Sequence, residues 1–201
     1  MKDKQSIVLE EPFQRLFFSN KKEHTFEGGH VMYVNSHLED YIEKLYNGIS
    51  INSPAQLDEY VIADRLDIRI YLANNSSEAF YWQDRYYIFI DRNLDGQQRW
   101  QDFAHELCHV LRHSGHQGHM SPPFRELQEW QSDNFMYHFC VPTFLLRRIR
   151  LPSDYQAAVY VIAKTFNVEM DFAKVRLNRY RQKVFPEVHQ FMEQIDSYAI
   201  E

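Results

Sequence analysis

The spacing of apolar residues predicts a short succession of helices and strands. An early helix is indicated by a shared apolar face at Leu38, Tyr41, Ile42 and Leu45. The stretch 79–90 is dense in aromatic and β-branched residues and is broken at Gln83-Asp84-Arg85, which predicts two strands around a turn. Helical spacing then predicts one helix over 98–111 and a second over about 125–140. Strands followed by helices favour an α+β fold.

The last third of the chain is predicted to be helical. After Pro142 the helical pattern is interrupted around 151–154, and it resumes as a helix over 157–166, a turn over 167–170 and a helix over 171–180. We therefore expect an N-terminal extension over 1–37, a main domain over 38–150, and a helix-turn-helix-like subdomain over 151–201 packed on the main domain. The apolar stretch 13–18 within the extension predicts either an extra hairpin or an arm over a cleft.

The helix predicted over 98–111 carries the sequence HELCH from His105 to His109, an HExxH motif. Residues four apart share a helical face, so both imidazoles can reach one metal ion. Glu106 then comes close to the water on that metal without binding the metal itself. The motif predicts two zinc ligands and a general base, since zinc lowers the pKa of its water to about 7 and Glu106 can take the proton and pass it to the leaving amine.

A catalytic zinc site usually takes a third protein ligand, which has to come from elsewhere in the chain. The metzincin frame is disfavoured, because Arg112 stands at the place of its glycine and Gly115 at the place of its third histidine. Glu129 and Asp133, four apart in the next predicted helix, are better candidates. We expect Glu129 to bind Zn²⁺ and Asp133 to accept a hydrogen bond from a liganding histidine.

Other polar residues around the motif have less specific interpretations. Candidates to stabilise the oxyanion of the reaction are Tyr137, His138, His113 and Arg112, although Tyr137 is also interpreted as a core residue. The loop over 112–121 is rich in histidine, and for His113, His116 and His119 a solvated connection is favoured over a second metal site. Pro122-Pro123 is expected to close this loop.

The motif-bearing residues resemble the ImmA/IrrE family of metallopeptidases, in the branch carried by phages and integrative elements. The resemblance rests on FAHELCHVL over 103–111, on Glu129 to Asp133, on Phe135 and on Val141-Pro142, and it extends over roughly 38–183. Ser132 and Met136 replace alanines of the family pattern at packing positions. The resemblance implies a zincin-like (minigluzincin) domain with a small mixed sheet, and a cytoplasmic zinc endopeptidase that cleaves the helix-turn-helix repressor of its own mobile element.

Composition agrees with a small enzyme that has no membrane-spanning segment. The chain has 201 residues, of which 44% are hydrophobic, enough for one core or for a core with an appended subdomain. It shows no long apolar run, and Met1 to Ser6 lacks the apolar segment of a signal peptide, so we expect a cytoplasmic protein without a membrane partner. Cys108 and Cys140 provide no disulfide framework and are interpreted as small buried residues.

Charge is distributed unevenly, which supports an alternative function. The stretch 147–183 holds nine Lys or Arg against three Asp or Glu, whereas the whole chain has a net charge of −6. A helix-turn-helix with Arg176 and Arg179 on its second helix suggests a non-catalytic antirepressor or DNA-binding regulator. Strong DNA binding usually takes a more extensive basic surface. We therefore favour the interpretation that these C-terminal helices pack against the catalytic domain and support it, with their basic residues in solvent.

Overall fold

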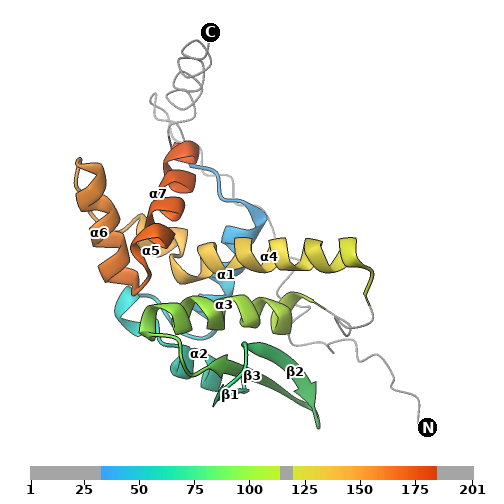
Figure 1. Ribbon diagram of the computed structural model, residues 1–201. Helices are drawn as coiled ribbons and strands as arrows, with labels where there is room; N and C mark the ends of the chain where they lie inside the picture. Colours follow the sequence, from blue (N-terminus) through green and yellow to red (C-terminus); the bar gives the residue numbers. More distant parts are fainter. Residues whose placement is uncertain (1–32, 114–119, 185–201) are drawn as a thin grey trace.

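The computed structural model describes residues 33–113 and 120–184, and these residues form a mixed α+β fold (Figure 1). Most of the predicted N-terminal extension, including the stretch 13–18, lies outside the described residues, as do His116, His119 and the last part of the predicted C-terminal subdomain. No helix in the described ranges is both long enough and apolar enough to cross a membrane.

The first elements of the described part of the chain are helices, and a small sheet follows. Helix α1 spans His37–Gly48, the 3-10 helix η2 spans Pro54–Gln56, and α2 spans Glu59–Arg65. Three strands follow, β1 (Ile68–Ala73), β2 (Glu78–Trp82) and β3 (Arg85–Asp91), in the order β1-β3-β2. Strand β3 pairs in parallel with β1 and antiparallel with β2, so the sheet is mixed, and β2 is an edge strand within the described sheet.

The predicted hairpin is confirmed, with its turn at Gln83 and Asp84. Both residues have positive φ values, 47° and 60°. A two-residue turn with positive φ at both positions follows the right-handed twist of the strands on either side.

Helices form the remaining layers. Helix α3 spans Gly96–Arg112 and α4 spans Pro122–Cys140, followed by α5 (Thr143–Leu146), α6 (Tyr155–Phe166) and α7 (Met170–Val184). In Figure 1, α3 lies between the sheet and α4, while α6 and α7 stand at one end of this stack. Helix α4 begins three residues earlier than the predicted start at about Arg125: Pro122 and Pro123 follow the loop directly and occupy the first turn of α4, where their missing N–H groups would have no helical partner in any case.

One hydrophobic core joins these layers. The side chains of Trp100 and Phe103 on α3 and of Phe139 on α4 are almost completely buried, together with Ile88 and Ile90 on the inner face of β3. The same core cluster includes buried residues of α6 and α7, such as Ile162 and Leu177 in the list of its members. Cys108 and Cys140 are buried free thiols, as predicted.

Local sequence explains where the central helices begin and end. Asp95 caps α3, because its carboxylate accepts hydrogen bonds from the backbone N–H groups of Gln97 and Gln98. Asp154 caps α6 in the same way, which places the start of α6 directly after the predicted interruption. Helix α6 ends at Asn167 in the left-handed conformation, with φ of 52°, and α7 begins three residues later.

Candidate metal centre and its surroundings

Helices α3 and α4 bring three potential metal ligands together. His105 and His109 lie on consecutive turns of α3, and Glu129 lies on the facing side of α4. The Nε2 atoms of the two histidines are 3.2 Å apart, and each is near a carboxylate oxygen of Glu129, at 3.2 Å for His105 and 3.7 Å for His109. All three potential ligand atoms lie within 4.8 Å of one another. The group could therefore hold one metal ion.

The cluster is closed on the histidine side and open on the glutamate side. The side chains of His105 and His109 are 18% and 11% exposed, whereas that of Glu129 is 44% exposed. Burial, assisted by the neighbouring imidazoles of His105 and His113, lowers the pKa of His109 to about 4. His109 is therefore neutral at pH 7, which is the state in which an imidazole binds a metal.

Glu106 lies next to this cluster and is almost buried, with 8% of its surface exposed. Burial, with a further contribution from the negative charges of Asp102 and Glu129, raises its pKa to about 8, while a hydrogen bond from the backbone N–H of Ala79 acts in the opposite direction. Since Ala79 belongs to β2, the carboxylate of Glu106 lies between the ligand-bearing helix and the edge strand. A carboxylate in this environment is suited to accept a proton near neutral pH.

The second ring nitrogen of each histidine also has a partner. Nδ1 of His105 is 3.1 Å from Oδ1 of Asp133, the contact expected from the sequence. Nδ1 of His109 is 3.0 Å from Nδ1 of His113, and Nε2 of His113 is 3.1 Å from Oε1 of Gln131. Gln131 was missed by the sequence analysis. The signal available was the position of His113, four residues after His109 and therefore on the same helical face.

The other candidates for stabilising an oxyanion make their described contacts elsewhere. The guanidinium of Arg112 lies over the ring of Tyr41 at 5.4 Å. Tyr137 stacks on Phe172 of α7, with ring centroids 4.4 Å apart, which agrees with its interpretation as a packing residue. Of the four candidates, the structure brings only His113 to a metal-ligand candidate.

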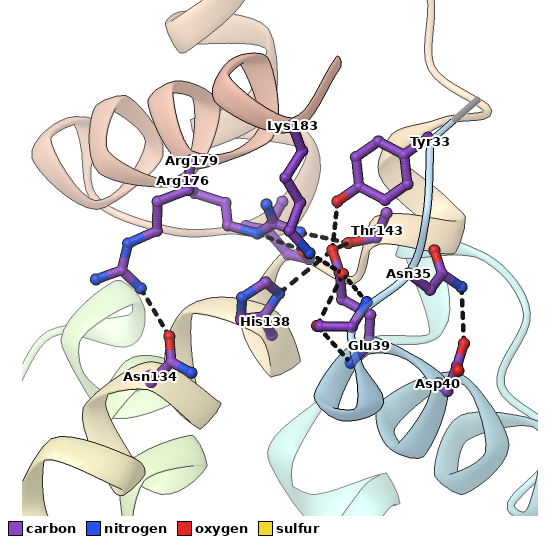
Figure 2. A network of polar contacts seen from close by, with 12 residues as sticks. Tyr33, Asn35, Glu39, Asp40, Asn134, His138, Thr143, Arg176, Arg179 and Lys183 are labelled. Carbon is purple, nitrogen blue, oxygen red and sulfur yellow. Dashed lines mark hydrogen bonds and ion pairs between the residues drawn. The ribbon is translucent and has the colours of Figure 1, made fainter. Parts of the chain in front are cut away.

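His138 belongs to a separate polar network that joins α1, α4, α5 and α7 (Figure 2). Its Nδ1 atom is 3.8 Å from Oε1 of Glu39, a residue that is only 3% exposed. Burial, and then the charge of Arg176, lowers the pKa of His138 to about 3. The side chain is thus a neutral member of a structural network.

The same network corrects the role of Arg176 in the DNA-binding interpretation. Arg176 is completely buried and donates hydrogen bonds to the carbonyl oxygen of Val141 and to Oγ1 of Thr143 (Figure 2). Arg179 lies 4.2 Å from the ring centroid of Tyr137 and donates to Asn134. Both arginines therefore link α7 to α4 and to the segment that follows it, and Arg176 is not accessible to a DNA phosphate.

Comparisons with known proteins give a family match that spans the two helices of this cluster. The family described as Peptidase M78, IrrE N-terminal-like domain, matches residues 63–178, a range that contains α3, α4 and most of α7. Two proteins of Bacillus subtilis (strain 168) are similar over most of the chain. The phage-like element PBSX protein XkdA is 41% identical over 148 residues, which cover 74% of this chain and 75% of the relative. The protein YqaB is 42% identical over 152 residues, 76% of this chain and 88% of the relative.

Among solved structures, a Mycobacterium tuberculosis transcriptional regulator is 15% identical with a TM-score of 0.47, and the match covers 68% of this chain and 45% of that chain.

The family match extends over more than half of the chain, and the two Bacillus relatives extend over about three quarters of it. The resemblance inferred from the motifs is therefore confirmed: the chain belongs to the ImmA/IrrE family of metallopeptidase-type proteins, Peptidase M78.

Proposed function

We propose that this protein is a zinc-dependent endopeptidase of the gluzincin type, which cleaves a helix-turn-helix repressor of a phage or mobile element in the cytoplasm and so derepresses its genes. The observation that carries the proposal is the convergence of His105, His109 and Glu129 beside the buried carboxylate of Glu106. The phage context is suggested by the name of the relative XkdA, which belongs to a phage-like element.

The three side chains fit zinc in both chemistry and spacing. Two imidazole nitrogens and one carboxylate oxygen are a ligand set of catalytic zinc, which leaves a fourth position open. Bonds of about 2.0–2.1 Å at tetrahedral angles place donor atoms about 3.3 Å apart. The two Nε2 atoms are 3.2 Å apart, close to that value, and they lie 3.2 and 3.7 Å from the two different carboxylate oxygens of Glu129.

In this proposal each residue has a separate task. Zinc, when bound, supplies a Lewis acid and an activated water for hydrolysis of the peptide bond. Glu106 takes the proton from the attacking water and delivers it to the leaving amine. Asp133 accepts the Nδ1–H of His105 and so holds its ring with Nε2 toward the ligand cluster.

The substrate chain would bind in an extended form along β2. This strand pairs with β3 on one side only in the described sheet, and the backbone of its residue Ala79 lies close enough to Glu106 to act on the pKa of that carboxyl. An extended peptide can add to such an edge through main-chain hydrogen bonds, which brings a peptide bond close to the carboxylate. We therefore expect cleavage in a repressor segment that is extended or locally unfolded.

The test is incubation with the repressor encoded beside the gene, using wild type, Glu106→Gln and the matched control Glu43→Gln. Glu43 lies on α1 and undergoes the same change from carboxylate to amide. We expect wild type and the control to cleave, and Glu106→Gln to bind zinc without cleaving. Cleavage by Glu106→Gln, or no cleavage by zinc-loaded wild type, would contradict the proposal.

A zinc titration tests the third ligand separately. Removing the carboxylate in Glu129→Ala should greatly weaken zinc binding, because a two-histidine site lacks one of its three protein ligands. Unchanged zinc affinity in this variant would exclude Glu129 as a ligand.

A further inference from the structure

A chain of two polar contacts leads away from the ligand His109. It begins at Nδ1 of His109, which is 3.0 Å from Nδ1 of His113. It continues from Nε2 of His113, which is 3.1 Å from the amide oxygen of Gln131. Ser132, the neighbour of Gln131 on α4, has its hydroxyl 3.3 Å from Nε2 of His109. Both ring nitrogens of His109 are therefore in contact with polar groups, of which the Ser132 hydroxyl can either donate or accept.

Only one assignment of protons satisfies all of these contacts. An amide oxygen only accepts, so His113 has to carry its proton on Nε2. Nδ1 of neutral His113 is then an acceptor, and His109 has to donate to it from Nδ1. The remaining nitrogen of His109, Nε2, keeps its lone pair and points to the cluster with His105 and Glu129. The hydroxyl of Ser132 can donate to the same lone pair in the metal-free protein.

We propose that Gln131 and His113 form a relay that fixes the tautomer of His109 and so positions its Nε2 atom for the metal. This inference rests on the proposed function, because it assigns His109 as a metal ligand. The relay does for His109 what Asp133 does for His105, with a neutral imidazole and an amide in place of a carboxylate. His113 and Gln131 are positioning residues in this scheme, since neither contacts substrate or metal.

The location of the two residues suits such a role. His113 is the C-cap of α3, one turn beyond His109, with an extended backbone at φ −107° and ψ 133°. Gln131 is placed on α4 two residues after the ligand Glu129, and its carbonyl oxygen accepts a weak hydrogen bond from the thiol of Cys108. The relay therefore links the end of the HExxH helix to the helix that supplies the third ligand.

Substitutions at His113 separate the relay from simple packing. His113→Leu fills the space with an apolar side chain that has no acceptor for the Nδ1–H of His109. His113→Asn can place an amide oxygen close to the position of the lost Nδ1 acceptor. Partners of this kind typically contribute 10–100-fold to metal affinity. We expect His113→Leu to weaken zinc binding roughly 10–100-fold, and His113→Asn to restore most of the loss. His37→Asn, at an exposed histidine on α1, is the matched control and should bind zinc as wild type does.

Two measurements test the relay: the zinc affinity of each variant and the tautomers of the two histidines. Zinc affinity is measured by competition with a chelator, and thermal melting of each metal-free variant shows that the fold is retained. Long-range proton–nitrogen NMR spectra of the metal-free protein report the tautomers directly, with His109 expected as Nδ1–H and His113 as Nε2–H. Gln131→Met should convert His113 into a mixture of tautomers, while Gln131→Glu should keep Nε2–H.

The possible results distinguish the relay from the proposed function. Equal zinc affinity of wild type and His113→Leu, or equal losses in His113→Leu and His113→Asn, would overturn the relay and leave the peptidase proposal intact. His109 found as the Nε2–H tautomer would overturn it as well. Failure of wild type to bind zinc, with the expected tautomers present, would instead contradict the proposed function and leave the tautomer assignment standing.

Discussion

Glu39 offers the most direct test of what holds α1 to the last described turn of α7. Its carboxylate is almost buried and accepts hydrogen bonds from Tyr33, Ser36, Thr143 and Lys183 (Figure 2). These donors come from the segment before α1, from α5 and from the last turn of α7. The substitution Glu39→Gln keeps the size of the side chain and removes its charge.

The structure sets the expected loss of stability. The hydroxyls of Tyr33 and Thr143 can rotate and accept from the new amide, but the backbone N–H of Ser36 and the ammonium of Lys183 can only donate. One charge-assisted hydrogen bond is worth about 1.5–3 kcal/mol, and removal of one partner from a buried ion pair costs about 3–5 kcal/mol. Because Lys183 is partly exposed and can turn to water, we expect about 2–3 kcal/mol for Glu39→Gln.

The loss should also depend on pH. Burial by itself would raise the pKa of Glu39, but the hydrogen bonds led by those from Lys183 and Ser36 outweigh it and hold the pKa well below the ordinary value of 4.5. A carboxyl whose pKa is lower in the folded state contributes its full stability above pH 4.5 and loses it as pH falls toward the folded pKa. The difference between wild type and Glu39→Gln should thus be constant from about pH 8 to about 5.5 and shrink in more acidic solution.

Urea unfolding monitored by circular dichroism, repeated across this pH range, measures the difference. Glu43→Gln is the matched control, because Glu43 lies on the same helix and no hydrogen bond or ion pair of its side chain is found among the described residues. We expect the control to change stability by less than about 0.5 kcal/mol. A loss below about 1 kcal/mol in Glu39→Gln, or a loss that does not change between pH 7 and pH 3, would refute this reasoning.

Three further predictions concern the core, a helix cap and a titrating side chain. Phe139→Ala should destabilise the fold by about 3–5 kcal/mol in urea unfolding, because Phe139 is fully buried and stacks on Tyr46; a loss under about 1 kcal/mol would contradict the assigned packing. Asp95→Ala should cost about 1 kcal/mol by removing the cap of α3, and Asp95→Asn should recover most of it. His138, whose pKa is lowered to about 3, takes up its proton at higher pH when unfolded than when folded. Stability should therefore fall as pH decreases from about 6.5 to 3, and His138→Asn should make this fall shallower, which urea midpoints at pH 7 and 5 will show.

Local rules account for much of the fold before any coordinates are known. The break at Gln83-Asp84-Arg85 and the dense apolar runs around it predict the hairpin of β2 and β3, because turn geometry and strand preference are properties of short segments. The start of α4 was placed too late for a related reason. Pro122 and Pro123 suit either the end of a loop or the first turn of a helix, and the sequence alone did not distinguish these positions.

Side chains that act through distant partners were harder to assign. Arg176 is a basic residue on a predicted second helix, and its charge suggested DNA contact. Its actual partners, Val141 and Thr143, are more than thirty residues away in the chain and become neighbours only when α7 packs against α4 and α5. Gln131 was missed because an amide acquires a role only beside the ring that it orients.

Residue spacing along the chain is enough to predict the chemistry that one helix can carry. The spacing of His105 and His109 places two imidazoles on one face of α3 because the α-helix repeats every 3.6 residues, and the same repeat places Glu129 and Asp133 together on α4. Tertiary structure decided how these faces meet. The distances between the ligand atoms, the contact of Glu106 with β2 and the partner of each imidazole depend on the packing of α3 between the sheet and α4. Such packing is set by contacts between residues far apart in the chain, which no local pattern records.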